Sequence, residues 1–359
     1  MSIVESEPMP AHGARAGRGS RGMAVLGLAV CCVFWGYSFP AMQMLSGAWD
    51  RAAGGQMRGA AAALALRATF LGWRFALAAG LYFLLTHPRQ RGHSANDWRA
   101  GLSVGGFMSL GMMLQIVGLR YTLPSVSAFI TALTIVFAPL GQSLFLRERV
   151  GGRIWLAVGV AFAGTVLLSA PNSSAVAAKT LVERPPLPYL GEVLTGLGAV
   201  IFTCQIIAVD RLAPRADVAR LTMIMLATVA VAHTTFGATL AGGGIYRPGV
   251  LELLVTDRTF LWVMPTLIVF STVGSLHLMN IFQPRISPAA ACVVYCLEPV
   301  FATAFSVIMR TELLTGITAA GGAVVLCAVL IVARAERADK RLTACSPGPS
   351  SAGSHRAGS

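Results

Sequence analysis

The sequence predicts an all-α polytopic membrane protein, with ten transmembrane helices arranged as two inverted five-helix repeats. Three observations carry this prediction. Of 359 residues, 55% are hydrophobic and only 12% are charged, whereas a soluble domain carries about 25% charged residues. The apolar residues form long uncharged stretches without the alternation of barrel strands, and two segments about half the chain apart read alike. Because the surplus apolar residues must face lipid, the composition excludes a soluble globular enzyme.

Ten windows along the chain are long enough to cross a bilayer, which takes roughly 20 helical residues. Five are uncharged over 25 to 27 residues, namely 23–49, 121–146, 154–178, 221–246 and 259–284. Three are shorter, namely 102–119, 193–209 and 313–333, and two contain one charge each, namely 68–86 with Arg74 and 287–309 with Glu298. The first window exceeds the apolar core of about 7 to 15 residues in a signal peptide, which indicates a retained span.

The windows divide the chain into two membrane halves and three polar segments. The predicted parts are a cytoplasmic tail over 1–22, a first five-helix repeat over 23–170, a periplasmic linker over 171–188, a second repeat over 189–334 and a cytoplasmic tail over 335–359. A cytoplasmic N-terminus places 18 of the 28 Lys and Arg residues in the cytoplasm and nine outside. The positive-inside rule therefore predicts that both termini are cytoplasmic. This orientation accounts for the net charge of +13, so we expect a lipid bilayer and no nucleic acid as partner.

The two halves resemble each other where their fourth helices run. One segment leads from Pro124 to Glu148, and the other leads from Ser287 to Glu312. The two glutamates are 164 residues apart, close to half the chain, and each precedes a Gly-rich last helix. A repeat of five spans, an odd number, has opposite orientations in its two copies, with a pseudo-two-fold axis in the membrane plane.

Six short pieces, taken in order, resemble the EamA-type members of the drug/metabolite transporter superfamily. They are Phe34-Trp-Gly-Tyr-Ser-Phe-Pro, Trp73-Arg-Phe-Ala-Leu-Ala-Ala, Gln115-Ile-Val-Gly-Leu-Arg-Tyr, Gln283-Pro-Arg-Ile-Ser-Pro, Leu297-Glu-Pro-Val-Phe-Ala and Thr311-Glu-Leu-Leu-Thr. The resemblance implies two inverted five-helix repeats, a bacterial inner-membrane location, and carriage of small metabolites, often outward. The chain departs from the family pattern at Ile135, where relatives carry Pro, at Phe202-Thr203, where many carry Trp, and in an insertion over 48–67.

Glu298 is the single acidic residue deep in a predicted span. A charge at the bilayer centre costs about 2.5 to 3.5 kcal/mol on insertion scales, so such a residue indicates function. In a central cavity its carboxylate would bind a cationic group of the substrate or exchange a proton. The alternative is a buried acid that pairs with a neighbouring helix. Pro299 follows it and should kink the helix, because proline lacks a backbone donor.

Other polar side chains in the spans are candidates for the same substrate or proton-binding cavity. Arg74, about seven residues inside the predicted outer end of its helix, either extends its head group to the interface or serves as counter-ion for Glu298 or an anionic substrate. His277 and Asn280 share a helix face, which suits a cavity lining or interhelical hydrogen bonds. Tyr295, one turn before Glu298, has a hydroxyl that can donate to the carboxylate. The remaining candidates are Trp35, Tyr37, Gln115, Gln205 and Thr131.

Glu148 and Glu312 end the fourth and ninth helices with arginines nearby. With Pro299, we assign them gate or structural roles. The seven cysteines show neither a disulfide framework nor zinc spacing, so no cofactor or metal is expected.

The predicted function is a secondary transporter that moves small polar metabolites by alternating access, with export favoured by the resemblance and proton coupling through Glu298. The chain has no P-loop, no HExxH and no acidic companion for Glu298 within a span, so catalysis is not expected. A flippase for a lipid-linked group, or less favourably a membrane-embedded enzyme, remains an alternative. The expected partners are a small-molecule substrate and the lipid bilayer. The sequence leaves open whether the chain forms a homo-oligomer.

Overall fold

A computed structural model describes the residues 20–52, 60–87, 92, 94–118, 121–122, 127, 130–131, 133–168, 187–241, 252, 256–309 and 314–344. This part of the chain is all-helical, as predicted. Eight of its helices are long and apolar enough to cross a membrane, and two more, Thr134–Phe145 and Gly152–Leu168, are apolar but shorter. The elements of the first half are α1 (Ser20–Ala52), α2 (Ala60–Thr86), α3 (Ala95–Gly118), α5 (Thr134–Phe145) and α6 (Gly152–Leu168). Each of these helices overlaps a predicted window, while most of the predicted linker lies outside the described residues.

The second half is more interrupted than the first. Its elements are α8 (Leu190–Leu212), η3 (Ala213–Arg215), α9 (Val218–Ala241), α11 (Arg258–Thr266), η5 (Leu267–Gly274), α12 (Ser275–Phe282), η6 (Gln283–Arg285), α13 (Pro288–Tyr295), α14 (Leu297–Ile308) and α15 (Gly316–Ala344). The helix α15 continues ten residues past the predicted start of the C-terminal tail.

One of the two interruptions of the apolar spans has an identifiable cause. The predicted helix over 287–309 is divided at Cys296 into α13 and α14. Pro299 lacks an N–H and its ring crowds the carbonyl four residues earlier, at Tyr295, where α13 ends. In the preceding span, the π-helix η5 lies between α11 and α12. A π-turn displaces backbone carbonyls from the regular ladder and is frequent at functional sites.

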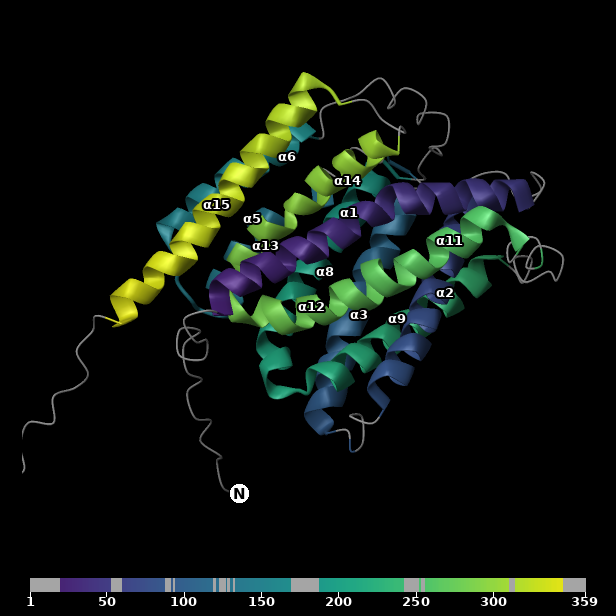
Figure 1. Cartoon of the computed structure of the whole chain (residues 1–359), viewed down its shortest axis with the longest axis horizontal. Helices are drawn as coiled ribbons and strands as arrows, with labels where there is room; N and C mark the ends of the chain where they lie inside the picture. The colour runs from purple at the N-terminus through teal and green to yellow at the C-terminus, as the bar shows by residue number, and fades with distance from the viewer. Residues whose placement is uncertain are drawn as a thin grey trace, which may run out of the picture.

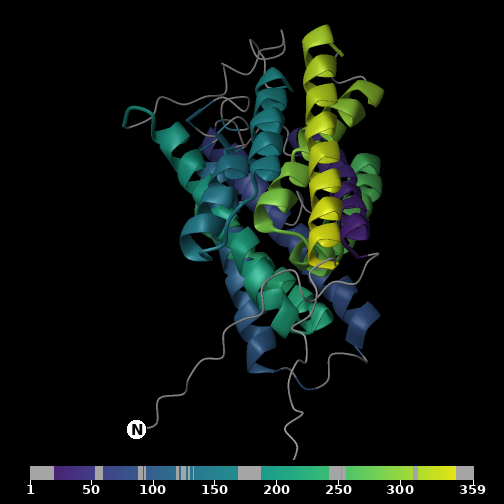
Figure 2. The same cartoon turned by 90° about the vertical axis from the view of Figure 1, so that its left-hand side faces the viewer.

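The helices form two outer pairs with the remaining helices between them. The pair α6 and α15 lies at one edge and the pair α2 and α9 at the opposite edge (Figure 1; Figure 2). Between them, α1 contacts α12, α13 and α14, while α3 contacts α8 and α9, and α5 contacts α8 and α13. In the two predicted repeats, α3 is equivalent to α12 and α1 is equivalent to α8. The contact of α3 with α8 therefore has its equivalent in the contact of α12 with α1. This correspondence supports the predicted repeat, which stays a prediction.

Glycines let the outer pairs approach closely. A Cβ at Gly72 of α2 would lie 2.7 Å from the backbone nitrogen of Thr234 in α9, and one at Gly237 of α9 would lie 2.8 Å from that of Thr69 in α2. The two Thr-x-x-Gly pairs thus meet reciprocally. Small residues of this kind permit close helix contact in membranes, where tight van der Waals contact drives association.

Candidate functional site

Glu298 lies at the middle of the interrupted span, as the eleventh of the 21 residues from Pro288 to Ile308. It occupies the first turn of α14, just after the break at Cys296. Its side chain is partly exposed. Among the described residues, its carboxylate has no hydrogen bond and no ion-pair partner. Because a buried charge that serves packing is normally paired, the absence of a described partner favours the functional interpretation.

The helix α1 holds aromatic residues against α14. A Cβ at Gly36 would lie 2.8 Å from the backbone nitrogen of Ala302, so the two helices touch at this glycine. The ring of Trp35 lies 5.4 Å from that of Tyr295, and the ring of Tyr37 meets Phe305 edge-on at 5.6 Å. Both predicted aromatic residues of α1 therefore lie beside the interrupted span that carries Glu298, Trp35 against α13 and Tyr37 against α14.

Tyr295 does not make the contact that the sequence suggested. Its hydroxyl donates to Oε1 of Gln283 at 2.8 Å rather than to Glu298. Gln283 is buried, and its Nε2 donates to the carbonyl of Ile206 in α8 at 2.8 Å. The sequence analysis did not select Gln283, because it lies at the end of the apolar window, where polar residues are ordinary. Its only signal was the Gln-Pro-Arg piece of the resemblance.

Arg74 is deeper than the sequence indicated. The helix α2 begins at Ala60, so Arg74 is the fifteenth of its 27 residues, about 18 to 21 Å along the axis from either end. Its side chain is only 7% exposed. This burial does not favour extension of the head group to the interface, and the role of Arg74 stays a prediction.

The π-helix supplies the partners of Arg74. Its Nε donates to Oγ1 of Thr272 at 2.5 Å, and its Nη2 donates to the carbonyl of Ser271 at 2.8 Å. Within the described residues no carboxylate pairs with it, so Glu298 is not its counter-ion here. Among the described residues, Arg74 and Glu298 are thus two side chains of opposite charge near the middle of apolar spans, each without a described ionic partner.

The other predicted residues fall into separate contacts. Nε2 of Gln115 donates to Oγ1 of Thr131 at 3.0 Å, which joins two predicted residues. Gln205 is buried, with its Nε2 3.8 Å from Sδ of Met279. Both thus lie at helix contacts, and their role in substrate binding stays a prediction.

His277 and Asn280 contact α2 and α9 rather than Glu298. The hydroxyl of Tyr82 lies 2.8 Å from Nδ1 of His277, and Nδ2 of Asn280 donates to Oγ1 of Thr222 at 3.0 Å. Asn280 is 1% exposed. This geometry favours the interhelical hydrogen bonds that were one of the two alternatives for this pair.

Of the two glutamates that end the predicted fourth and ninth helices, only Glu148 lies within the described residues. Oε1 of Glu148 lies 3.7 Å from Nη2 of Arg211, at the end of α8, and its Oε2 accepts from Nε2 of Gln142 at 3.3 Å. Glu148 therefore contacts the second half of the chain as well as its own sequence neighbours. Glu312 lies outside the described residues.

Comparisons with known proteins agree with this architecture. Residues 22–170 match the EamA-like transporter family. The chain is 25% identical over 310 residues to an uncharacterized transporter of Archaeoglobus fulgidus, which covers 86% of this chain and 85% of the relative. One protein of known crystal structure has a similar fold, with a TM-score of 0.65 and 16% identity over 89% of this chain and 100% of that one. The segment that matches the EamA-like transporter family thus spans the helices of the first half, from α1 to α6.

Proposed function

We propose that this protein is a secondary transporter that carries a small polar solute across the inner membrane by alternating access, with Glu298 at the centre of its substrate or proton site. The match to the EamA-like transporter family and the transporter relative support a membrane transporter, and the apolar helices support a multi-pass membrane protein. Export follows the family resemblance, and both termini are assigned to the cytoplasm by the distribution of arginine and lysine.

The observation that carries the proposal is the state of the Glu298 carboxylate. It lies in the middle of a span, beside a helix break, partly exposed and without a described partner. A carboxylate in this situation gains most from a cationic substrate group or a proton. Helix breaks near the midplane, between two inverted halves, are where secondary transporters bind substrates and coupling ions.

Arg74 extends this proposal to the opposite charge. Two of its three nitrogens bond to the π-helix, and no described carboxylate neutralises it. A solute with both a cationic and an anionic group would supply counter-charges for both residues. Together, Glu298 and Arg74 favour a polar or zwitterionic solute over an apolar one.

The test begins with purified protein and a panel of small metabolites, in which a binder raises the unfolding temperature by mass action. A radiolabelled form of the strongest binder is then followed in proteoliposomes. We expect the solute to cross the membrane chemically unchanged. Glu298→Gln should slow its exchange at least about tenfold, which corresponds to roughly 1.4 kcal/mol. Glu298→Asp should retain part of the wild-type exchange rate. The exposed acid Glu252 provides the control, and Glu252→Gln should transport normally. A chemically altered product, or equal exchange by wild type and Glu298→Gln, would overturn the proposal.

A further inference from the structure

Another carboxylate in the described part of the chain lies far along the sequence from Glu298 and, unlike Glu298, is almost fully buried. Asp97, in the first turn of α3, is 1% exposed. Its Oδ2 accepts from the backbone nitrogen of Ser94 at 2.8 Å, while Oγ of Ser94 accepts from the backbone nitrogen of Asp97 at 3.2 Å. This reciprocal pair is a capping box that begins α3. Helix capping explains an acidic residue at this position, but it accounts for only one of the hydrogen bonds that the carboxylate accepts.

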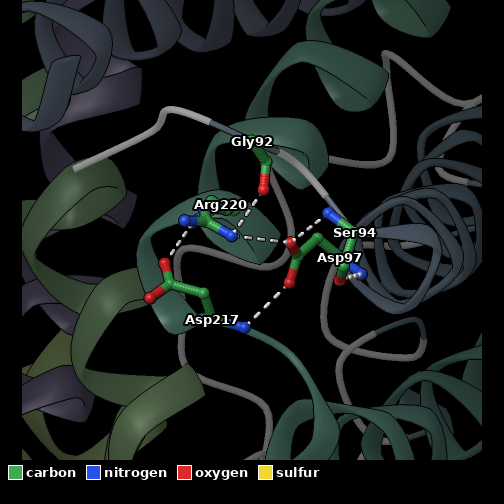
Figure 3. Close-up of polar contacts among 5 residues, drawn as sticks. All are labelled: Gly92, Ser94, Asp97, Asp217 and Arg220. Carbon is green, nitrogen blue, oxygen red and sulfur yellow. Dashed lines mark hydrogen bonds and ion pairs between the residues drawn. The ribbon is translucent and has the colours of Figure 1, made fainter. Parts of the chain in front are cut away.

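The rest of the Asp97 carboxylate bonds to the other half of the chain (Figure 3). Its Oδ1 accepts from the backbone nitrogen of Asp217 at 2.9 Å, and its Oδ2 lies 3.3 Å from Nη1 of Arg220. Asp217 in turn caps α9, because its Oδ1 accepts from the backbone nitrogen of Arg220 at 3.0 Å. One carboxylate therefore joins the first turns of α3 and α9, which belong to different halves.

Arg220 also reaches the connection between α2 and α3. Its Nη1 donates to the carbonyl of Gly92 at 2.8 Å. Gly92 has a φ of 75°, in the left-handed region that glycine adopts readily. Nevertheless, the side chain of Arg220 is 22% exposed, whereas that of Asp97 is 2% exposed. Water thus reaches one side of the ion pair, so the pair can separate without first unfolding either helix.

A second set of contacts between the halves lies at the same end of the molecule. The helix α8 leads through η3 directly into α9, so Arg211 at the end of α8 lies at the end where Asp217 begins α9. Arg211 pairs with Glu148 at 3.7 Å, and the backbone nitrogen of Ala289 donates to Oε1 of Gln142 at 3.4 Å. The positive-inside rule assigns this end to the cytoplasm.

We propose that Asp97, Asp217 and Arg220 form a clasp, which closes this end of the transporter and opens when solute passes between Glu298 and that side of the membrane. The inference rests on the proposed alternating access. A cap for α3 alone needs only Ser94 and Asp97. The additional donors come from the first turn of α9, and they tie together two helices that belong to different halves.

A reporter cysteine at Glu298 tests the clasp without knowledge of the substrate. Glu298→Cys is placed in full-length protein whose native cysteines are replaced, and a membrane-impermeant maleimide is added to vesicles of each orientation. We expect Arg220→Gln to raise labelling from the clasp side about tenfold, by shifting the population toward the open state. Arg220→Lys, which keeps the charge, should give an intermediate rate. The matched control is Arg99→Gln, which removes an exposed charge from the same turn of α3, and it should leave labelling unchanged.

A cross-link gives the opposite perturbation. In the same reporter protein, Asp97→Cys and Arg220→Cys are oxidised to a disulfide before the maleimide is added, which leaves the single reporter thiol free. Labelling is then read at the peptide that contains residue 298. Labelling from the clasp side should fall to background and return after reduction, while labelling from the other side persists. Each single cysteine variant, treated alike, should show no such loss.

The outcomes separate the clasp from the carrier proposal. Suppose that the reporter is labelled from both sides, but that neither Arg220→Gln nor the cross-link changes the rate of labelling from the clasp side. The clasp is then overturned and the carrier proposal stands. If no variant is labelled from either side, the carrier proposal is overturned, and the clasp with it. Thermal unfolding of each variant establishes that the labelled protein is folded.

Discussion

Asp97 and Glu298 are both carboxylates removed from bulk water, but their surroundings are opposite. Asp97 is almost fully buried and accepts hydrogen bonds from Ser94, Asp217 and Arg220. Glu298 is partly exposed, and no described residue bonds to its carboxylate. A satisfied buried carboxylate stabilises one arrangement of helices, whereas an unsatisfied and accessible one remains available to a ligand. The contrast agrees with the proposed roles, in which Asp97 holds one end of the structure and Glu298 serves transport.

Replacing Asp97 should have the largest effect on stability. Asp97→Ala leaves the backbone nitrogen of Asp217 and the guanidinium of Arg220 without their acceptor, and breaking a buried pair from one side costs about 3 to 5 kcal/mol. We expect the free energy of unfolding in detergent to fall by about 3 kcal/mol, measured by denaturant titration. A loss below about 1 kcal/mol would show that the clasp contributes little.

Replacing a glycine at the contact of α2 with α9 should have the next largest effect. A Cβ at Gly72 would meet the backbone of Thr234, which cannot move aside as a side chain can. Gly72→Ala should therefore cost about 1 to 3 kcal/mol, as overpacking does elsewhere. Gly80 of the same helix has open space around its Cα, so Gly80→Ala should be neutral or slightly stabilising. Equal unfolding temperatures for the two variants would contradict the close contact.

Removing the hydroxyl of Tyr295 should have a smaller effect. Tyr295→Phe keeps the ring against Trp35 but leaves Oε1 of buried Gln283 without a donor, which costs about 1 to 2 kcal/mol. Gln283→Leu alone also removes the donor to the carbonyl of Ile206, so the double variant should lose less stability than the sum of the two single variants. If the double variant is as destabilised as the sum of the single variants, the bond does not link these residues.

Neutralising Glu298 should have the smallest effect on stability and so sharpen the contrast with Asp97. Glu298→Gln removes no described contact and lowers the cost of burying a charge. We expect its free energy of unfolding to equal that of the wild type or exceed it by up to about 1 kcal/mol. A destabilisation comparable to that of Asp97→Ala would reveal a structural partner for Glu298.

The membrane helices were predictable because the absence of charge over about 20 residues is a local signal. The position of Glu298 and the helix break near Pro299 were also readable, since both follow from single residues in an apolar stretch. The depth of Arg74 was misjudged because Arg67 shortened the uncharged window, whereas the helix begins at Ala60.

The contacts of the polar residues could not be predicted, because their partners are distant in sequence. The Ser-x-x-Asp spacing of Ser94 and Asp97 is a recognisable helix start. However, Arg220 lies 123 residues from Asp97, and no local pattern joins them. Tyr295 likewise bonds to Gln283, twelve residues earlier, rather than to Glu298, and no local pattern joins these two residues.

The proposed mechanism assigns Glu298 to transport rather than to helix contacts. The most direct measurement is the rate of solute exchange in proteoliposomes across a range of pH, for the wild type and Glu298→Gln. If the Glu298 carboxyl exchanges a proton, or binds the solute in its ionised form, the exchange rate of the wild type depends on pH. This dependence disappears in Glu298→Gln, because the amide does not titrate. A variant that exchanges solute as fast as the wild type, with the same pH profile, would remove Glu298 from the mechanism.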